Sequence, residues 1–375
     1  MNSKKIVAAL AASLALGLSN AEEVKIGCVS GITGPLALTT ADVLKVTTTY
    51  LDQVNAKGGV NGNQLKLVLR DDGYDPKKTV GMVEDIVAKD HVVVLVNGAG
   101  TANTATLVKT GTLNKYKLPL VGVYSGSEAI RGPGSDQIFH TRASYNDEIM
   151  KIARHVSTIG LKRVAVFYQD DGFGADVLAS LTKASQQYNF DIVLKSPYKP
   201  GERDFAANAK QLIASKPQAI LLMGVPEAVY RFMKVYDAPT GFAQLYALSF
   251  VSPKGLAEFA GEEKVRGIGI SQVVPNPNSS EFALSREFKN FMQTPSLKGI
   301  TPSPFLFEAY LNIRLAVEAI KLSGPHPTPE KVTQSLSSMH DYKLAGYPID
   351  FTSTNRRGSS YLDIAVVGVN ARLSY

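Results

Sequence analysis

The sequence predicts an α/β protein with two similar lobes, each built around a parallel sheet that helices flank. From Val24 onward, short apolar runs alternate with segments whose apolar residues recur at helical spacing. The alternation comes in two successive series, and neither series looks like a finished domain. Strands that alternate with helices favour parallel sheets covered on both faces, which is the basis of the prediction.

The first series starts after residue 23. Its strands are predicted at residues 24–29, 65–69, 92–96, 118–123 and 137–141. Its first helix is predicted at residues 40–57, where apolar residues share one face and Gly58-Gly59 follows. Its second helix is expected to start at Asp75-Pro76, because proline suits the first helical position.

The second series starts with a helix that Asn146 or Asp147 can cap. The strands that follow are predicted at residues 163–168, 190–194, 219–223, 245–248 and 267–271, with helices at 204–215, 227–236 and 254–260. A proline-rich linker at residues 275–278 leads to the last elements. These are helices at residues 280–292, 304–322 and 328–339 and strands at 344–351 and 360–369.

The N-terminus has the pattern of a secretory signal peptide. Lys4 and Lys5 precede an apolar run at residues 6–18, and Ser19-Asn20-Ala21 offers a cleavage site after Ala21. The run is too short for a helix that spans a bilayer, so the alternative of an N-terminal anchor is disfavoured. We therefore expect residues 1–21 to be removed and the mature protein to be exported.

Composition narrows the possible functions of the chain. With 45% hydrophobic and 19% charged residues it is ordinary globular protein. The net charge of +7 falls to +5 without the signal peptide, and the basic residues are scattered, so we expect no nucleic-acid partner. Cys28 is the only cysteine, and we expect a buried, inert thiol without a disulfide.

Two turns in the first series are candidates for a ligand site. Small and hydroxyl residues follow two neighbouring apolar strands, Gly100 and Thr101 after the first and the segment Tyr124-Ser125-Gly126-Ser127 after the second. Small residues let a ligand approach the backbone, and hydroxyls with free N–H groups at a helix start suit an anion. Ligands of open α/β sheets bind at the carboxyl ends of strands. The alternative is an ordinary pair of strand-to-helix turns.

Sequence signatures of catalysis and metal binding are missing. The five histidines have no metal-ligand spacing, and the chain contains neither a G-x-S-x-G elbow nor a phosphate-binding loop. We therefore expect no metal, no cofactor and no enzyme activity. Asp71-Asp72 and Asp170-Asp171 each end a strand and could act as general acids or bases. The favoured interpretation is that these acids cap the next helix or accept N–H groups of turns.

Several motifs resemble a known family. The segments SGITGP at residues 30–35 and NAKGGVNG at 55–62, followed by Asp71-Asp72 and Asp75-Pro76, resemble the leucine/isoleucine/valine-binding-protein family of periplasmic solute receptors. The resemblance extends to about residue 369. It implies two α/β lobes joined by three crossovers, with a ligand in the cleft between them and closure by a hinge motion. The implied lobes are residues 22–141 plus 276–345 and residues 142–275 plus 346–375.

The resemblance also assigns roles to individual residues. The carboxylate-binding serine of the family corresponds to Thr101, and its second binding loop corresponds to Ser125 and Ser127. A tyrosine of the second lobe corresponds to Phe173, which keeps the aromatic wall. Arg142 could pair with a ligand carboxylate or could instead anchor the crossover.

One position departs from the amino-acid receptors. In those receptors an acid of the second lobe meets the ligand's ammonium group, but residues 249–251 are Ser-Phe-Val. An unpaired buried ammonium group is costly, so an aromatic or aliphatic carboxylate becomes a rival to an amino acid. Phe250, Tyr124 and Tyr145 would then form walls, with Val225 on the facing lobe. An acid from elsewhere, such as Asp147, could still compensate.

The sequence thus predicts a periplasmic receptor of an ABC importer, which binds a small carboxylate-bearing ligand without chemistry. Its expected partners are that ligand and the permease subunits in the inner membrane, and we expect a monomer. The alternatives are a ligand-sensing receptor for chemotaxis or signalling, and an exported α/β enzyme.

Overall fold

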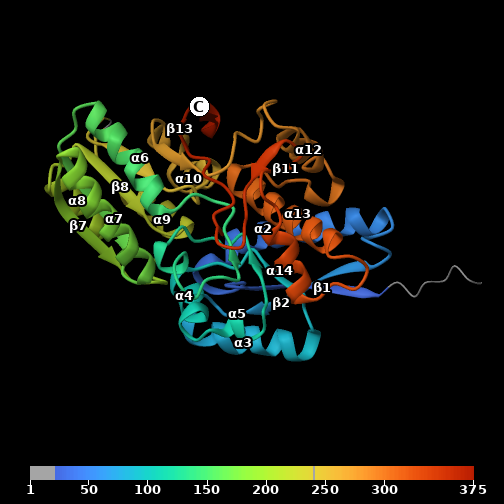
Figure 1. Cartoon of the computed structure of the whole chain (residues 1–375). Helices are drawn as coiled ribbons and strands as arrows, with labels where there is room; N and C mark the ends of the chain where they lie inside the picture. Colours follow the sequence, from blue (N-terminus) through green and yellow to red (C-terminus); the bar gives the residue numbers. More distant parts are fainter. Residues whose placement is uncertain (1–21, 240) are drawn as a thin grey trace, which may run out of the picture.

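The computed structural model describes residues 22–239 and 241–375, which form two lobes side by side (Figure 1). The predicted signal peptide, residues 1–21, lies outside the described residues. Within the described ranges, no helix is long and apolar enough to cross a membrane. Each lobe is built around one large sheet, of five strands in the N-terminal lobe and seven in the C-terminal lobe.

The sheet of the N-terminal lobe is parallel throughout, with the strand order β2-β1-β3-β4-β5. Its strands are β1 (Glu23–Ser30), β2 (Gln64–Asp71), β3 (Val94–Val96), β4 (Leu120–Val121) and β5 (Ile138–Phe139). The central strand β3 is fully buried, because helices cover both faces of a parallel sheet. This arrangement places the carboxyl ends of β1, β3 and β4 at one edge.

Early and late helices together cover this sheet. The early ones are α2 (Ala37–Ala56), α3 (Pro76–Asp90), α4 (Thr101–Lys109) and α5 (Thr112–Lys115), and the late ones are α12 (Ala283–Phe291), α13 (Pro304–Leu322) and α14 (Pro329–Ser337). The apolar helix α13 packs against α2 and the sheet in one core, although more than 200 residues separate the two helices in sequence (Figure 1). The hairpin of β11 (Tyr342–Leu344) and β12 (Tyr347–Ile349) joins the same core.

The sheet of the C-terminal lobe has the order β14-β13-β10-β9-β8-β6-β7. Its parallel strands are β6 (Arg163–Gln169), β7 (Asp191–Tyr198), β8 (Ala219–Met223), β9 (Gln244–Ala247) and β10 (Gly269–Gln272). The antiparallel strands β13 (Asp363–Val367) and β14 (Leu373–Ser374) complete one edge. The helices of this lobe are α6 (Tyr145–Thr158), α7 (Gly172–Tyr188), α8 (Ala206–Ala214), α9 (Pro226–Val235), α10 (Pro253–Ala260) and α11 (Glu262–Val265).

The helix cap predicted for α6 is wrong by two or three residues. The cap is Ser144, whose hydroxyl accepts a hydrogen bond from the Asp147 backbone N–H at 3.2 Å. The Asp147 carboxylate accepts hydrogen bonds in return from the Ser144 backbone N–H at 3.0 Å and from its hydroxyl at 2.7 Å. This is a capping box, in which two residues three apart satisfy each other's free groups. Asp147 is therefore committed to the helix start.

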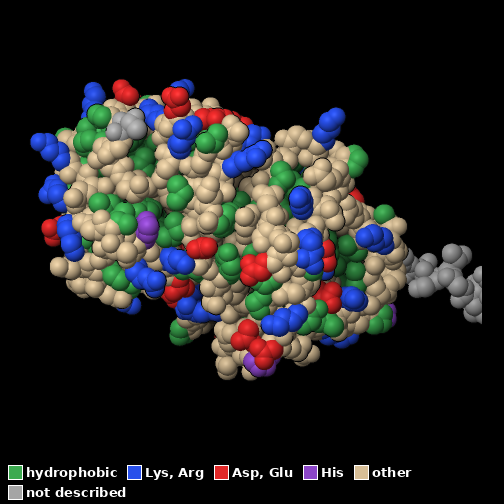
Figure 2. All heavy atoms as spheres, turned by 90° about the horizontal axis from the view of Figure 1, so that it is seen from above, with side chains coloured by type: hydrophobic (Ala, Val, Ile, Leu, Met, Phe, Trp, Pro, Cys, Tyr) green, Lys and Arg blue, Asp and Glu red, His purple; other side chains and the backbone are tan. Residues whose placement is uncertain are grey.

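The chain crosses between the lobes three times: after β5, after β10 and after the β11–β12 hairpin. Tyr347, Ile349 and Phe351 pack in the core of the N-terminal lobe, because their apolar side chains meet α13 and α14 there. The predicted lobe bounds stay a proposal, and we amend them by placing the third crossover after Phe351 rather than after Ala345. Over the face shown in Figure 2, basic and acidic side chains are interspersed without a single-sign patch.

Candidate ligand-binding site

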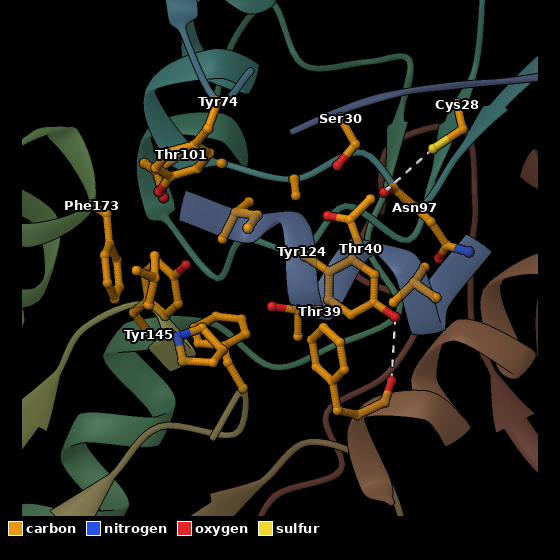
Figure 3. Close-up of a pocket in the computed structure, with 18 residues that line it drawn as sticks. Cys28, Ser30, Thr39, Thr40, Tyr74, Asn97, Thr101, Tyr124, Tyr145 and Phe173 are labelled. Atoms are coloured by element: carbon orange, nitrogen blue, oxygen red, sulfur yellow. Dashed lines mark hydrogen bonds between the residues drawn. The ribbon is translucent and has the colours of Figure 1, made fainter. Parts of the chain in front are cut away.

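A cavity lies where the carboxyl ends of the strands of both sheets face each other (Figure 3). Its unfilled volume is about 610 Å³, part of which is open to solvent. Both lobes line it, with Cys28, Ser30, Leu36, Thr39, Thr40, Val43, Tyr74, Asn97, Ala99, Gly100, Thr101, Tyr124 and Phe305 on one side and Tyr145, Phe173, Val225, Pro226 and Phe250 on the other. Concave, largely apolar sites with a few polar groups are typical of small-molecule pockets.

The turn between β3 and α4 forms one end of the cavity. Gly100 has φ 104°, and a Cβ there would lie 2.5 Å from Asn103 Oδ1 and 2.8 Å from Tyr74 Cε2, so the position requires glycine. Thr101 is the first residue of α4, and no side chain caps this helix. Free N–H groups at a helix start attract an anion.

Three hydroxyl groups gather beside this helix start. The hydroxyls of Thr101 and Ser125 are hydrogen-bonded at 2.8 Å. Burial raises the pKa of Tyr145, while hydrogen bonds with Ser125 and Thr101 act in the opposite direction. The three hydroxyls therefore lie within reach of one another, and the two that line the cavity, Thr101 and Tyr145, come from different lobes.

The second predicted turn contributes only in part. Tyr124 lines the cavity, whereas Ser125 lies behind Thr101. Gly126 accepts a hydrogen bond from the Tyr145 backbone N–H at 2.7 Å through its carbonyl oxygen. The Ser127 hydroxyl accepts one from the Ala129 N–H at 3.2 Å and caps a short 3₁₀ helix, residues Glu128–Ile130. Gly126 and Ser127 therefore shape the wall from behind, and their predicted ligand contact stays a prediction.

Aromatic rings form much of the remaining wall. In the C-terminal lobe, the ring of Tyr145 lies 5.0 Å from that of Phe173 and 5.8 Å from that of Phe250, centroid to centroid. In the N-terminal lobe, the rings of Tyr124 and Phe305 lie 4.6 Å apart. Val225 and Pro226, at the start of α9, add apolar atoms to the wall of the C-terminal lobe.

Arg142 does not line the cavity but lies buried behind Phe250. Its guanidinium carbon is 4.2 Å from the centroid of the Phe250 ring, and its Nη2 donates to the Ser249 hydroxyl. Arg142 Nη2 lies 3.8 Å from Glu148 Oε1, and Arg142 Nε lies 3.5 Å from Glu308 Oε1. Of the two roles considered for Arg142, the geometry favours the structural one, because its charge already faces two carboxylates.

This cluster, Arg142 with Glu148 and Glu308, joins parts of the molecule that belong to different lobes. Glu148 is on α6 of the C-terminal lobe, Glu308 is on α13 of the N-terminal lobe, and Arg142 is in the first crossover. Burial lowers the pKa of Arg142, but the two glutamates more than offset this and raise it above its ordinary value. Burial raises the pKa of Glu308 to about 7, against the opposing effect of Arg142. The three charged groups therefore connect α6, the first crossover and α13.

The acids singled out in the sequence serve the backbone instead. Asp71 accepts hydrogen bonds from the N–H groups of Ile32, Thr33 and Gly73. Asp72 accepts from the Tyr74 N–H and from the Thr79 hydroxyl, and Asp171 caps α7. The interpretation of these three acids as turn and cap acceptors is confirmed.

Several lining residues were not predicted. Ser30 ends β1, and the rule for strand ends could have found it. Cys28, predicted as a buried thiol, is buried as expected and lines the cavity floor, and burial raises its pKa to about 12. Tyr74 and Phe305 carry no sequence signal, because tertiary packing alone brings their loop and helix to the cavity.

Direct contacts hold the lobes together around the cavity. The Gln169 side-chain N–H donates to the Tyr74 hydroxyl at 3.1 Å across the cleft. On another side, Lys254 Nζ donates to the Thr301 hydroxyl at 2.7 Å. Leu36 of the N-terminal lobe packs into the core of the C-terminal lobe. The two lobes therefore contact each other at several places around the cavity.

Comparison with known proteins decides the family. Residues 23–371 match the family described as periplasmic binding protein. The chain belongs to the periplasmic binding protein family. Its match spans nearly all of the described chain and includes both lobes and all three crossovers, which confirms the predicted family, the α/β fold and the two-lobe architecture.

Individual relatives share the fold of this periplasmic binding protein at modest identity. A Leu/Ile/Val-binding protein from Citrobacter freundii is 23% identical over 298 residues, covering 78% of this chain and 76% of the relative. A substrate-binding periplasmic protein from Ralstonia solanacearum is 32% identical with a TM-score of 0.86, covering 92% and 98% of the two chains. A solute-binding protein of an ABC transporter from Rhodopseudomonas palustris BisB5, in complex with 3,4-dihydroxybenzoic acid, is 20% identical with a TM-score of 0.80, covering 94% and 95%.

Membership of the family also sets the general role. Its members bind small solutes, work with ABC transporters and are periplasmic, and their fold is that of solute-binding proteins rather than enzymes.

Proposed function

We propose that this periplasmic binding protein is the receptor of an ABC importer that encloses a small carboxylate-bearing ligand between its lobes. The observation that carries the proposal is the cavity, which both lobes line and which has hydroxyl groups and an uncapped helix start at one end. The named relatives include a Leu/Ile/Val-binding protein and a protein in complex with 3,4-dihydroxybenzoic acid. Both ligand types carry a carboxylate, which is the group proposed here.

The carboxylate is held at the N-terminal lobe in this proposal. The Thr101 hydroxyl and the first N–H groups of α4 donate to it, and the positive end of the helix dipole adds to their effect. Tyr145 reaches the same end from the facing lobe. Because the ligand then contacts both lobes, it stabilises the closed form relative to an open one.

Transport follows from closure. The closed receptor presents both lobes to permease subunits in the inner membrane and releases the ligand there. The chain acts as a monomer, after export and cleavage behind Ala21, and performs no chemistry on the ligand. The commitment of Asp71, Asp72 and Asp171 to turns and caps supports a binding role over the enzyme alternative.

Thr101→Val should weaken binding of the carboxylate by roughly 10- to 100-fold, since a hydrogen bond to a charged group is worth about 1.5–3 kcal/mol. The shapes of threonine and valine are nearly equal, so the unliganded protein should keep its melting temperature to within a few degrees. The measurement is a thermal-shift screen of amino acids and of aromatic and aliphatic acids, in which a ligand raises stability by RT ln(1 + [L]/Kd).

Thr106→Val is the matched control for this substitution. Thr106 is on the same helix, outside the cavity, and its hydroxyl donates to the Ala102 carbonyl oxygen at 2.9 Å. Its replacement should leave ligand affinity unchanged. The proposal is wrong if no small acid or amino acid shifts the melting temperature of the wild-type protein. The assignment of Thr101 to the ligand carboxylate is wrong if Thr101→Val and Thr106→Val bind the ligand equally well.

A further inference from the structure

The wall of the cavity is rich in aromatic rings and carries no charge. Six aromatic residues line it: Tyr74, Tyr124, Tyr145, Phe173, Phe250 and Phe305. None of the described lining residues is an aspartate, glutamate, lysine, arginine or histidine. We infer that the site selects an aromatic acid without an ammonium group and rejects α-amino acids. The inference rests on the proposed function, which supplies the carboxylate.

Asp72 and Asp171, which follow the ends of strands β2 and β6, cannot serve an ammonium group without giving up other partners. The Asp72 carboxylate accepts from Thr79 at 2.8 Å and from Asn103 at 3.0 Å. The Asp171 carboxylate accepts from the Phe173 N–H at 2.9 Å and from Gln169 at 2.7 Å. Asp72 is fully buried and Asp171 is half-buried, and neither lines the cavity, because each carboxylate serves its own turn or helix start.

The other two candidates face away from the ligand. Glu148 and Glu308 flank Arg142, which lies behind the Phe250 ring, and the side chains of all three are at most 1% exposed. Asp147, considered from the sequence as a substitute, is held in the capping box of α6. An ammonium group in the cavity would therefore lose its water without gaining a counter-charge, which is unfavourable.

The arrangement of the rings indicates what the site does accept. Tyr145, Phe173 and Phe250 pack tilted or edge to face, with centroids 5.0–6.2 Å apart, and present an aromatic surface from the C-terminal lobe. Tyr124 and Phe305 form a second surface on the N-terminal lobe. A flat ring held between them gains ring–ring contacts that a saturated ring of similar volume cannot make.

Matched ligands test the inference on the wild-type protein by isothermal titration calorimetry at pH 7. Phenylacetate and 3-phenylpropanoate are each compared with the amino acid that adds one ammonium group, phenylglycine and phenylalanine. They are also compared with the saturated analogues cyclohexylacetate and 3-cyclohexylpropanoate. We expect the better aromatic acid to bind roughly 100-fold or more tightly than its amino acid. We expect it to bind roughly 3- to 10-fold more tightly than its saturated analogue.

A variant adds a readout tied to the rings. Phe173→Leu should remove most of the preference for the aromatic over the saturated ring. Phe259→Leu, outside the cavity on α10, should keep that preference. If Phe173→Leu and Phe259→Leu show the same preference for the aromatic over the saturated acid, the proposed role of the Phe173 ring is wrong.

The inference and the proposed function fail in different ways. Binding of an amino acid as tight as that of its aromatic acid overturns the inference and leaves the receptor function standing. The same holds if neither aromatic acid binds while an aliphatic acid or amino acid does. If no acid of any kind binds, the proposed function falls and the inference falls with it.

Discussion

Arg142→Met should lower the free energy of unfolding by about 3–5 kcal/mol at pH 7, because it leaves buried carboxylates without their counter-charge. Glu148 and Glu308 lie within 3.8 Å and 3.5 Å of the guanidinium, and all three side chains are at most 1% exposed. The measurement is urea unfolding followed by far-ultraviolet circular dichroism. Arg154→Met, an exposed change on α6, should alter stability by less than about 0.5 kcal/mol.

The loss of stability caused by Arg142→Met should grow with pH. In the wild-type protein burial raises the pKa of Glu308 from 4.5 to about 7. A folded-state pKa above the unfolded one means that the folded protein holds more protons, so stability falls between pH 4.5 and 7, by at most about 1.4 kcal/mol per pH unit. Arg142 lowers the pKa of Glu308, so its removal raises that pKa further. The pH range over which stability falls then extends to higher pH. Arg142→Met should therefore cost more at pH 8 than at pH 5.

Neutral glutamines separate the charge effect from packing. The triple variant Arg142→Met, Glu148→Gln, Glu308→Gln should recover most of the lost stability, since no unpaired charge remains buried. If the triple variant is as unstable as Arg142→Met, or if the loss is the same at pH 5 and pH 8, the cluster does not act through its charges.

Gly122→Ala should lower the free energy of unfolding by roughly 3–5 kcal/mol, because it combines backbone strain with overpacking. Gly122 has φ 66°, and a Cβ there would overlap the side chain of Asn312. Asn312 is fully buried, donates to Asn97 Oδ1 at 2.8 Å and accepts from the Thr141 hydroxyl at 2.6 Å. The methyl group would break this network, which ties α13 to the sheet.

Gly132→Ala is the control for this substitution. Gly132 has no atom within 4 Å of the added Cβ, so its replacement should change stability by less than about 0.5 kcal/mol. Urea unfolding gives the free energy of unfolding of both variants. If Gly122→Ala is as stable as Gly132→Ala, Asn312 can move aside at little cost.

Sequence patterns predicted the fold and the part of the cavity wall that belongs to the N-terminal lobe, both for the same physical reason. Parallel strands have regular spacing, and their carboxyl ends meet, so the sequence predicted that Gly100, Thr101 and Tyr124 lie close together, and all three line the cavity. The side-chain directions of Ser125 and Ser127 depend on the turn geometry, which composition does not encode. Strand β14 was missed because two residues carry no periodicity, and the hairpin of β11 and β12 was predicted as one strand at residues 344–351.

The facing lobe was harder to predict. Phe173, Val225 and Phe250 were placed by family resemblance, and all three line the cavity. Arg142 lies behind them, since two glutamates distant in sequence compete for its charge. Phe305 joins the wall only because α13 returns from the end of the chain to the first lobe.

A crystal structure of the protein with its tightest-binding acid tests the central claim most directly. We predict that the ligand lies between the lobes, with its carboxylate within hydrogen-bonding distance of the Thr101 hydroxyl and of an N–H group at the start of α4. Its remaining atoms should contact Phe173 or Phe250. A ligand bound outside this cavity, or one whose carboxylate lies away from Thr101 and α4, would contradict the account.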